Sequence, residues 1–100
     1  MNYYLGVDAG GSKTYTIITD EDGSIVGKGR SGNGNHQLGA EEARHNIRES
    51  VGMALTQARL TPDEIAFAYF GMAGADREAD FRVLRPMIAE LGFPRHEIVC

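Results

Sequence analysis

The residues near the start of the chain whose types could do chemistry are one acid, two glycines and three polar residues: Asp8, Gly10, Gly11, Ser12, Lys13 and Thr14. An Asp at the end of a strand can hold a divalent cation or its water, and glycines let backbone amides approach a phosphate. The lysine would add a cation, and the threonine a hydroxyl, to the same pocket. We expect Asp8 to be buried, where an unused carboxylate would be costly. The stretch therefore predicts a phosphate-binding loop.

Three strands are predicted around and after this loop, at residues 2–8, 14–20 and 25–30, because these runs are rich in aliphatic, aromatic and β-branched residues. An Asp-Gly pair at 22–23 is typical of a hairpin turn between the second and third strands. Glycines in the third strand favour an edge or bulged strand. The apolar first strand indicates a central strand that is covered on both faces.

An apolar stripe from residue 40 to about 60 predicts one long helix. Gly52 weakens this helix by roughly 1 kcal/mol relative to alanine, and we interpret it as a mark of close packing on the sheet. Thr61 and Pro62 predict the start of a short turn. Residues 65–70 then form a run of strand length, which after a helix should lie parallel to the first strand.

A second helix is predicted after Asp76, and we expect that residue to cap it. Pro86 lies inside the apolar pattern of this helix and predicts a break or a restart. Residues 97–100 begin a fifth strand. The order β-β-β-α-β-α-β predicts an α/β fold, in which helices pack on the faces of a twisted mixed sheet and ligands gather at the C-terminal ends of the parallel strands.

The composition predicts a single cytoplasmic domain. The net charge of the 100 residues is -4 and no basic run occurs, so nucleic acid and acidic membranes are poor partners. No apolar stretch approaches the roughly 18 residues that cross a bilayer, and the N-terminus lacks the pattern of a signal peptide. The single cysteine, Cys100, makes neither a disulfide framework nor a metal site, and we expect it to be a buried strand residue.

Three familiar motifs are present only in part or in the wrong structural context. Residues 6–11 have the glycine spacing of a P-loop, but Ser12 stands where the lysine belongs and the chain continues into a strand rather than a helix. Residues 27–32 fit the dinucleotide pattern G-x-G-x-x-G only within a hairpin strand. A two-metal nuclease would need further carboxylates around Asp8.

At residues 8–14, Asp-Ala-Gly-Gly-Ser-Lys-Thr, the chain resembles the first phosphate motif of the acetate-and-sugar-kinase, heat-shock and actin superfamily. More narrowly, it is similar to the BadF/BadG/BcrA/BcrD ATPase family and, within it, the N-acetylglucosamine kinases. Further stretches carry this resemblance at 34–37 (Gly-Asn-His-Gln), 40–43 (Ala-Glu-Glu-Ala) and 71–76 (Gly-Met-Ala-Gly-Ala-Asp). It implies a ribonuclease H-like fold duplicated into two lobes around an ATP cleft. Residues 1–100 would be the N-terminal part of the first lobe, truncated before the catalytic Asp.

The resemblance also implies roles for individual residues. Asp8 would act at Mg²⁺ and the phosphates of ATP, through water. The phosphate loop would be lined by Gly10, Gly11 and Ser12, with Lys13 and Thr14 at its exit. The implied sugar-binding residues are Asn35, His36, Ala73, Gly74 and Asp76. Without the resemblance, the Asn-His pair would read as plain loop formers.

The function implied is an ATP-dependent amino-sugar kinase that transfers the γ-phosphoryl group to N-acetylglucosamine or a related sugar. The catalytic base is expected beyond Cys100, so we expect the 100-residue chain alone to be inactive. Two alternatives stay open: an ATPase that activates a radical dehydratase, and a non-catalytic α/β binding module. A half-lobe would also expose apolar surface, which predicts self-association or a homodimer.

Overall fold

A computed structural model describes residues 1–99 of the chain; Cys100, with the buried strand position expected for it, lies outside the described residues. The five strands form one sheet in the order β3-β2-β1-β4-β5. The elements along the chain are β1 (Tyr3–Ala9), β2 (Thr14–Thr19), β3 (Ile25–Ser31), the short 3₁₀ helix η1 (His36–Leu38), α1 (Ala40–Ala58), the 3₁₀ helix η2 (Pro62–Glu64), β4 (Ile65–Met72), α2 (Glu78–Ala89) and β5 (His96–Val99). The predicted order of strands and helices is confirmed.

The strand pairing is mixed, as predicted. β2 lies antiparallel between β1 and β3, whereas β4 lies parallel to β1 and β5 lies parallel to β4. The hairpin turn between β2 and β3 is held by Asp20, whose Oδ1 accepts from the N–H of Asp22 at 2.9 Å and of Ser24 at 3.0 Å. Gly23 in this turn has φ +83°, a conformation that favours glycine. β3 is an edge strand, as its glycines predicted.

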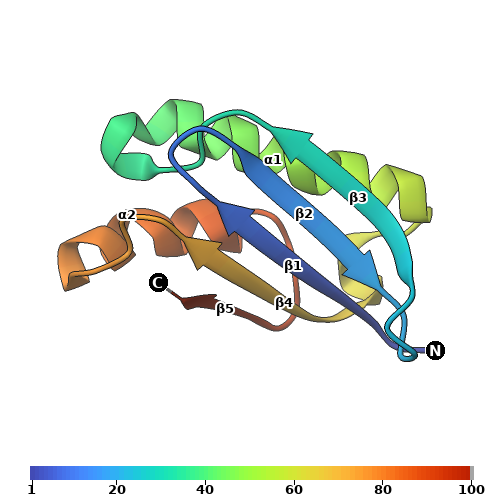
Figure 1. Ribbon diagram of the computed structural model, residues 1–100. Helices are drawn as coiled ribbons and strands as arrows, with labels where there is room; N and C mark the ends of the chain where they lie inside the picture. The colour runs from blue at the N-terminus through green and yellow to red at the C-terminus, as the bar shows by residue number, and fades with distance from the viewer. Residues whose placement is uncertain (100) are drawn as a thin grey trace.

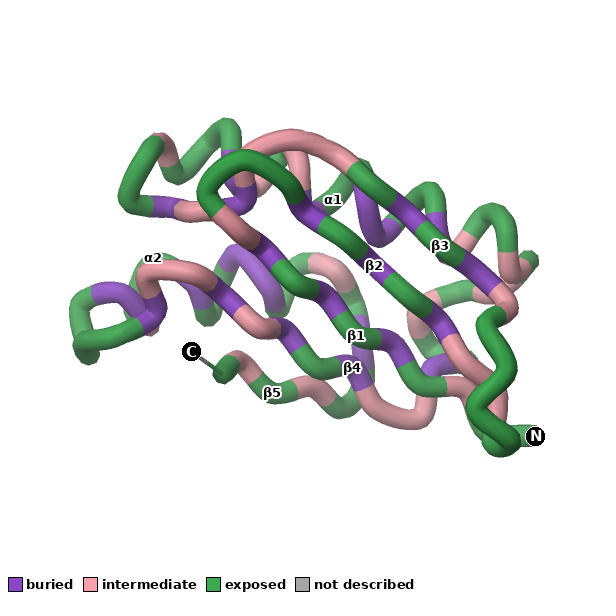
Figure 2. The backbone as a smooth tube through the Cα atoms, in the orientation of Figure 1, coloured by how far each residue is buried: buried purple, intermediate pink, exposed green. Residues whose placement is uncertain are grey.

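Both helices cover the same face of the sheet and leave the other face open (Figure 1). Burial therefore alternates along the strands, as Figure 2 shows. On β1, Leu5, Val7 and Ala9 are buried under the helices, whereas Tyr4 and Asp8 are exposed on the open face. The prediction that the first strand is covered on both faces is wrong within the described residues, because its apolar character comes partly from tyrosine on the open side.

α1 lies very close to the sheet where it crosses β3. A Cβ added to Gly27 would lie 2.3 Å from the carbonyl oxygen of Ala54, and one added to Gly29 would lie 1.9 Å from that of Ser50. These two glycines let α1 approach more closely than any larger residue would allow. The interpretation of Gly52 is wrong, because that residue is exposed and has nothing within 4 Å of the position its Cβ would take.

The second helix differs from its prediction in two ways. Asp76 does not cap it: α2 begins at Glu78 with Arg77 as its N-cap, and the side chain that accepts the Arg77 N–H belongs to Asp80. The helix also continues through Pro86 without a break. Because Pro86 is exposed, its ring points away from the sheet and the helix still packs through Leu84, Met87 and Ile88. Neither α1 nor α2 is long and apolar enough to span a bilayer, and the same holds for every helix within residues 1–99.

Candidate functional site

Three loops that are far apart in the sequence meet at the C-terminal ends of β1 and β4 (Figure 1). The N–H of Gly34 donates to the carbonyl oxygen of Gly10 at 2.9 Å, and the N–H of Ala73 donates to that of Ala9 at 2.9 Å. These two bonds hold the loop after β3 and the loop after β4 against the end of β1. The predicted phosphate loop and the predicted sugar-binding segments therefore lie at one edge of the sheet.

The predicted phosphate loop is a tight turn of residues 10–13. The N–H of Gly10 donates to the carbonyl oxygen of Lys13 at 2.8 Å. Gly11, Ser12 and Lys13 are exposed, and within residues 1–99 no acceptor is found for the N–H of Gly11 or Ser12. Two free backbone donors and one lysine on a small loop are suited to an anionic group such as a phosphate.

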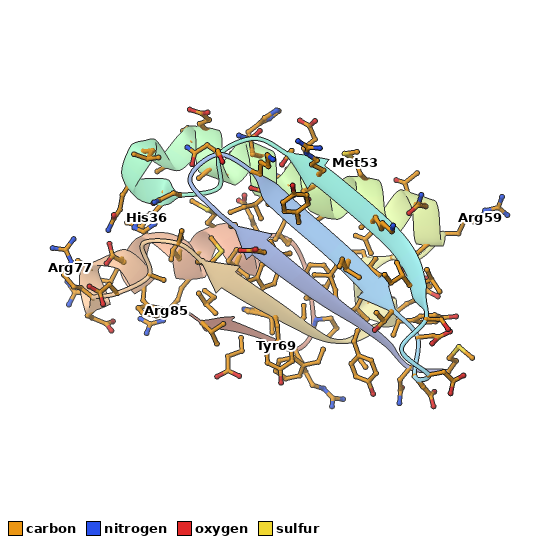
Figure 3. The ribbon with its side chains drawn as sticks, in the orientation of Figure 1. His36, Met53, Arg59, Tyr69, Arg77 and Arg85 are labelled. Carbon is orange, nitrogen blue, oxygen red and sulfur yellow. The ribbon has the colours of Figure 1, made fainter. Side chains whose placement is uncertain are left out.

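Asp8 is not buried, contrary to the expectation. It lies on the open face of the sheet, between Tyr15 on β2 and Gly71 on β4. A shallow hollow on this face is lined by Asp8 together with Tyr15, Ile17 and Tyr69, and Figure 3 shows Tyr69 projecting from the open side. Residues 1–99 contain no group of three or more side chains that could hold a metal ion. A cation at Asp8 would thus find no cluster of further carboxylate or histidine ligands within residues 1–99.

Thr14 faces the other side of the sheet from Asp8. Its side chain is fully buried, and its hydroxyl donates to the carbonyl oxygen of Gly32 at 2.8 Å. Gly34 lies directly on this threonine, since an added Cβ there would be 2.4 Å from Thr14 Oγ1 and 2.7 Å from Ala9 Cβ. The structure therefore places the Thr14 hydroxyl under the 32–34 loop rather than on the exposed phosphate loop.

The loop that carries Asn35 is held by its own amide side chains. Asn33 Oδ1 accepts from the Asn35 N–H at 2.8 Å, and Asn35 Oδ1 accepts from the Gln37 N–H at 2.9 Å. Asn46 on α1 donates to the carbonyl oxygen of Asn33 at 2.9 Å. Asn35 stays partly exposed within this framework. Its side-chain oxygen Oδ1 caps η1, which leaves the Nδ2 of the same amide as a donor.

His36 is placed differently from what the sequence indicated. Its ring is buried, with 9% of the residue exposed, and its Nε2 lies 2.9 Å from Oδ1 of Asp80, which is 4% exposed. The pKa of the Asp80 carboxyl lies far below its usual range. The main cause is the hydrogen bond from the backbone N–H of Arg77, and the hydrogen bond from the His36 ring is the second. The other ring nitrogen, Nδ1, is buried without a partner in the described part of the chain.

Sequence reasoning gave no role to Asp80, and it named Gln37 only within the stretch 34–37 that carries the resemblance. Gln37 Nε2 donates to the carbonyl oxygen of Gly74 at 3.2 Å and lies 3.4 Å from Asp80 Oδ1. The signal for Asp80 was present in the stretch 77–80, where an acid three residues after a helix cap is typical of a side chain that binds the free N–H groups. A buried histidine has no comparable periodic signal.

The loop after β4 completes this edge of the sheet. Gly74 has φ +82°, and a Cβ there would lie 2.8 Å from Asn35 Oδ1. Ala73 and Gly74 are partly exposed beside Asn35, whereas the Asp76 side chain is exposed. Figure 3 shows His36 and Arg77 at the same end of the molecule, one before α1 and one at the start of α2. The structure thus brings Asn35 and Gly74 together on the helix side, while Asp8 lies on the open side.

The sheet order and its helices define the class of fold. Over 99% of this chain and 35% of the other, the structure superposes on a Chromobacterium violaceum protein provisionally assigned as an N-acetylglucosamine kinase, with a TM-score of 0.73 and 19% identity. The likeness identifies a ribonuclease H-like half-lobe: a mixed five-stranded sheet with helices packed on it.

The chain belongs to the BadF/BadG/BcrA/BcrD ATPase family, whose model matches residues 5–100. It is 36% identical over 78 residues to glucosamine kinase GspK of Vibrio cholerae, covering 78% of this chain and 26% of that protein. It is 31% identical over 94 residues to the N-acetylmuramic acid/N-acetylglucosamine kinase of Clostridium acetobutylicum, covering 93% of this chain and 31% of that protein. The chain thus spans between a quarter and a third of the length of these relatives.

Proposed function

We propose that the protein containing this chain is an ATP-dependent amino-sugar kinase that transfers the γ-phosphoryl group of ATP to a hydroxyl of N-acetylglucosamine or a related sugar. The observation that carries this proposal is the meeting of three loops at the end of β1. Backbone hydrogen bonds from Gly34 and Ala73 bring a loop with free amide donors next to a loop that presents an Asn side chain. Family membership and the sugar-kinase relatives support the same chemistry.

The phosphate-binding half of the proposed site consists of residues 8–14. The free N–H groups of Gly11 and Ser12 would bind phosphate oxygens, and Lys13 would add a positive charge. Asp8 is the carboxylate that would hold Mg²⁺ through water. When bound with ATP, Mg²⁺ neutralises charge on the phosphates. Thr14 would hold the 32–34 loop in place, because its buried hydroxyl donates a hydrogen bond to the carbonyl oxygen of Gly32.

The sugar-binding half consists of Asn35, Ala73, Gly74 and Asp76, with His36 beneath them. Asn35 Nδ2 would donate to a sugar hydroxyl or to the acetamido carbonyl, and the exposed Asp76 would accept from hydroxyl groups. Small residues at 73 and 74 would let a sugar ring approach the backbone. We place no catalytic base among residues 1–99, and we propose that the base and most of the adenosine pocket belong to other parts of the protein, so that residues 1–100 alone are inactive.

The test is a coupled assay of ADP release by the full-length protein with Mg-ATP and a panel of sugars. We expect turnover with glucosamine, N-acetylglucosamine or N-acetylmuramic acid, and much slower turnover with glucose. An Asp8→Asn variant should lose about 100-fold or more in kcat, because the carboxylate that would hold Mg²⁺ next to the phosphates is removed. The matched control is Asp22→Asn in the β2–β3 turn, an exposed carboxylate remote from the three loops.

Absence of sugar-dependent ADP release from folded full-length protein would overturn the proposal. If that protein instead hydrolysed ATP without sugar, bound iron and absorbed visible light, it would be a dehydratase activator. Sequencing the gene beyond the codon for Cys100 gives an independent check. We expect the reading frame to continue into an acidic motif and a second lobe, whereas an immediate stop codon would favour a binding module.

A further inference from the structure

The buried contact between His36 and Asp80 joins two segments that are 44 residues apart in the sequence. Both side chains are 6% exposed, and the atoms in contact are 2.9 Å apart. One segment carries Asn35 and the other follows Gly74, so the contact lies directly behind the proposed sugar site. A charged carboxylate is rarely buried unless all its lone pairs are used.

Asp80 uses its two oxygens for two different segments. Oδ2 accepts from the backbone N–H of Arg77 at 2.9 Å and of Asp76 at 3.3 Å, at the start of α2. Oδ1 faces His36 Nε2 and, at 3.4 Å, Gln37 Nε2 in the loop before α1. Because a carboxylate can only accept, Nε2 of His36 must carry the proton. The hydrogen-bond donors on both sides therefore require an acceptor at each oxygen.

An asparagine could replace Asp80 only if His36 moved its proton from Nε2 to Nδ1 and the Gln37 amide turned over. The amide of the asparagine would present NH₂ on one side, against either the N–H groups of α2 or the donors of the loop. With Nε2 of His36 protonated and the Gln37 amide as it stands, only the ionised carboxylate satisfies both sides together. The depressed pKa of Asp80 agrees with this geometry, because every one of these hydrogen bonds favours the charged form.

We propose that Asp80 is a positioning residue for the sugar: by holding His36 and Gln37 to the start of α2, it fixes Asn35 against Gly74. This inference rests on the proposed function. Asn35 Oδ1 accepts from the Gln37 N–H at 2.9 Å, and Gln37 in turn donates to the carbonyl oxygen of Gly74 at 3.2 Å. Asp80 thus lies at one end of a series of hydrogen bonds that passes through Gln37 and ends at the Asn35 side-chain amide. Its effect on the sugar passes through its neighbours.

The test compares Asp80→Asn with Glu78→Gln in the full-length protein. Glu78 is a matched control because it lies in the same first turn of α2 and its replacement by Gln also removes one charge. It is exposed, and within residues 1–99 its ion pair is with Arg85 at 2.8 Å. We expect Asp80→Asn to raise the KM for the sugar about 10-fold or more, as expected for the loss of a hydrogen bond to a charged group. The KM of Asp80→Asn for ATP should stay within about twofold of the wild-type value. The same holds for the KM values of Glu78→Gln for the sugar and for ATP.

A role in folding alone predicts a different result. The fraction of active protein would fall, which lowers the apparent kcat and leaves the KM for the sugar unchanged. That pattern, or an unchanged KM with unchanged kcat, would overturn the proposal. If Asp80→Asn does not fold, Gln37→Met serves instead, because Gln37 is exposed and methionine has the same length without the hydrogen bonds. Its sugar KM should rise by about threefold while its melting temperature is unchanged.

A second readout does not depend on kinase activity. Hydrogen exchange of the backbone amides of residues 36–39 should be faster in Asp80→Asn than in Glu78→Gln, because the loop loses its anchor. If wild-type protein phosphorylates no amino sugar, the proposed function fails, and the exchange measurement still tests whether Asp80 holds the loop. Equal exchange in the two variants would show that it does not.

Discussion

Replacing Gly34 by alanine tests whether the loop that carries Asn35 must lie directly on the ends of β1 and β2. Gly34 is buried, and its φ is not in the positive range, so the effect is steric. The added Cβ would lie 2.4 Å from Thr14 Oγ1 and 2.7 Å from Ala9 Cβ, whereas ordinary contact begins at 3.4 Å. The loop must therefore move outward by about 1 Å to restore normal contact.

This movement would cost stability and activity together. Overpacking at a buried position costs about 1–3 kcal/mol. It would also strain the hydrogen bond from the Gly34 N–H to the Gly10 carbonyl oxygen, which is 2.9 Å long and joins the loop that carries Asn35 to the proposed phosphate loop. A displacement of about 1 Å at a positioning element can lower kcat/KM by about 100-fold. We therefore expect a larger loss in kcat/KM than the loss of stability alone would produce.

The assay is steady-state kinetics with amino sugar and Mg-ATP, beside urea unfolding of the same protein. The matched control is Gly52→Ala, the same chemical change at an exposed helix position where nothing lies within 4 Å of the added atom. That control should raise the free energy of unfolding by about 0.5–1 kcal/mol, because alanine favours a helix interior, and leave the kinetics unchanged. A Gly34→Ala protein with wild-type stability and kcat/KM would refute the reasoning.

Three other predictions follow from the packing and the charges. Gly29→Ala, whose Cβ would lie 1.9 Å from a carbonyl oxygen of α1, should destabilise the protein by about 3 kcal/mol or more, measured by urea unfolding. Because the pKa of Asp80 is depressed in the folded state, its ionised carboxylate stabilises the fold fully above about pH 4, which is the pKa of an Asp in the unfolded chain, and this stabilisation is lost as the pH falls below that value. In acid unfolding curves, the free energy of unfolding of Asp80→Asn should therefore fall less than that of wild type as the pH is lowered through this range. The 100-residue chain should associate with rising concentration in sedimentation velocity, because Ile17 and Tyr69 are 42% and 50% exposed on the open face, and Ile17→Lys with Tyr69→Lys should reduce that association.

The fold was predictable because its main signals are local. Strand runs, the Asp-Gly turn and the long apolar stripe each identified an element, and the strand–helix–strand order fixed β4 as parallel to β1. The errors concern which side of an element faces the core. Gly52 and the β3 glycines look alike in the sequence, yet only Gly27 and Gly29 face α1. Pro86 is tolerated because it lies on the exposed side of α2.

The candidate site was predictable as a set of loops but not as a set of contacts. The order of the strands placed residues 10–13, 33–37 and 72–76 at one edge, and the structure brings them together there. The sequence could not show that His36 turns inward, because burial of a loop residue depends on a partner far along the chain. Here that partner is Asp80, whose carboxylate satisfies the imidazole.

The residues at this edge separate into two kinds that should respond differently to substitution. Ala9, Gly10, Gly34 and Ala73 act through backbone hydrogen bonds and small size, so larger side chains there alter the distance between loops before they alter any chemistry. Asp8 presents a polar side chain to the exposed surface, on the open side of the sheet, so its loss would remove the proposed contact to Mg²⁺ while the loops stay in place. Changes of the first kind should therefore lower stability and sugar affinity together. Loss of Asp8 should lower kcat at wild-type stability, and a kinase whose Asp8 variant unfolds instead would show that this carboxylate holds the fold rather than the phosphates.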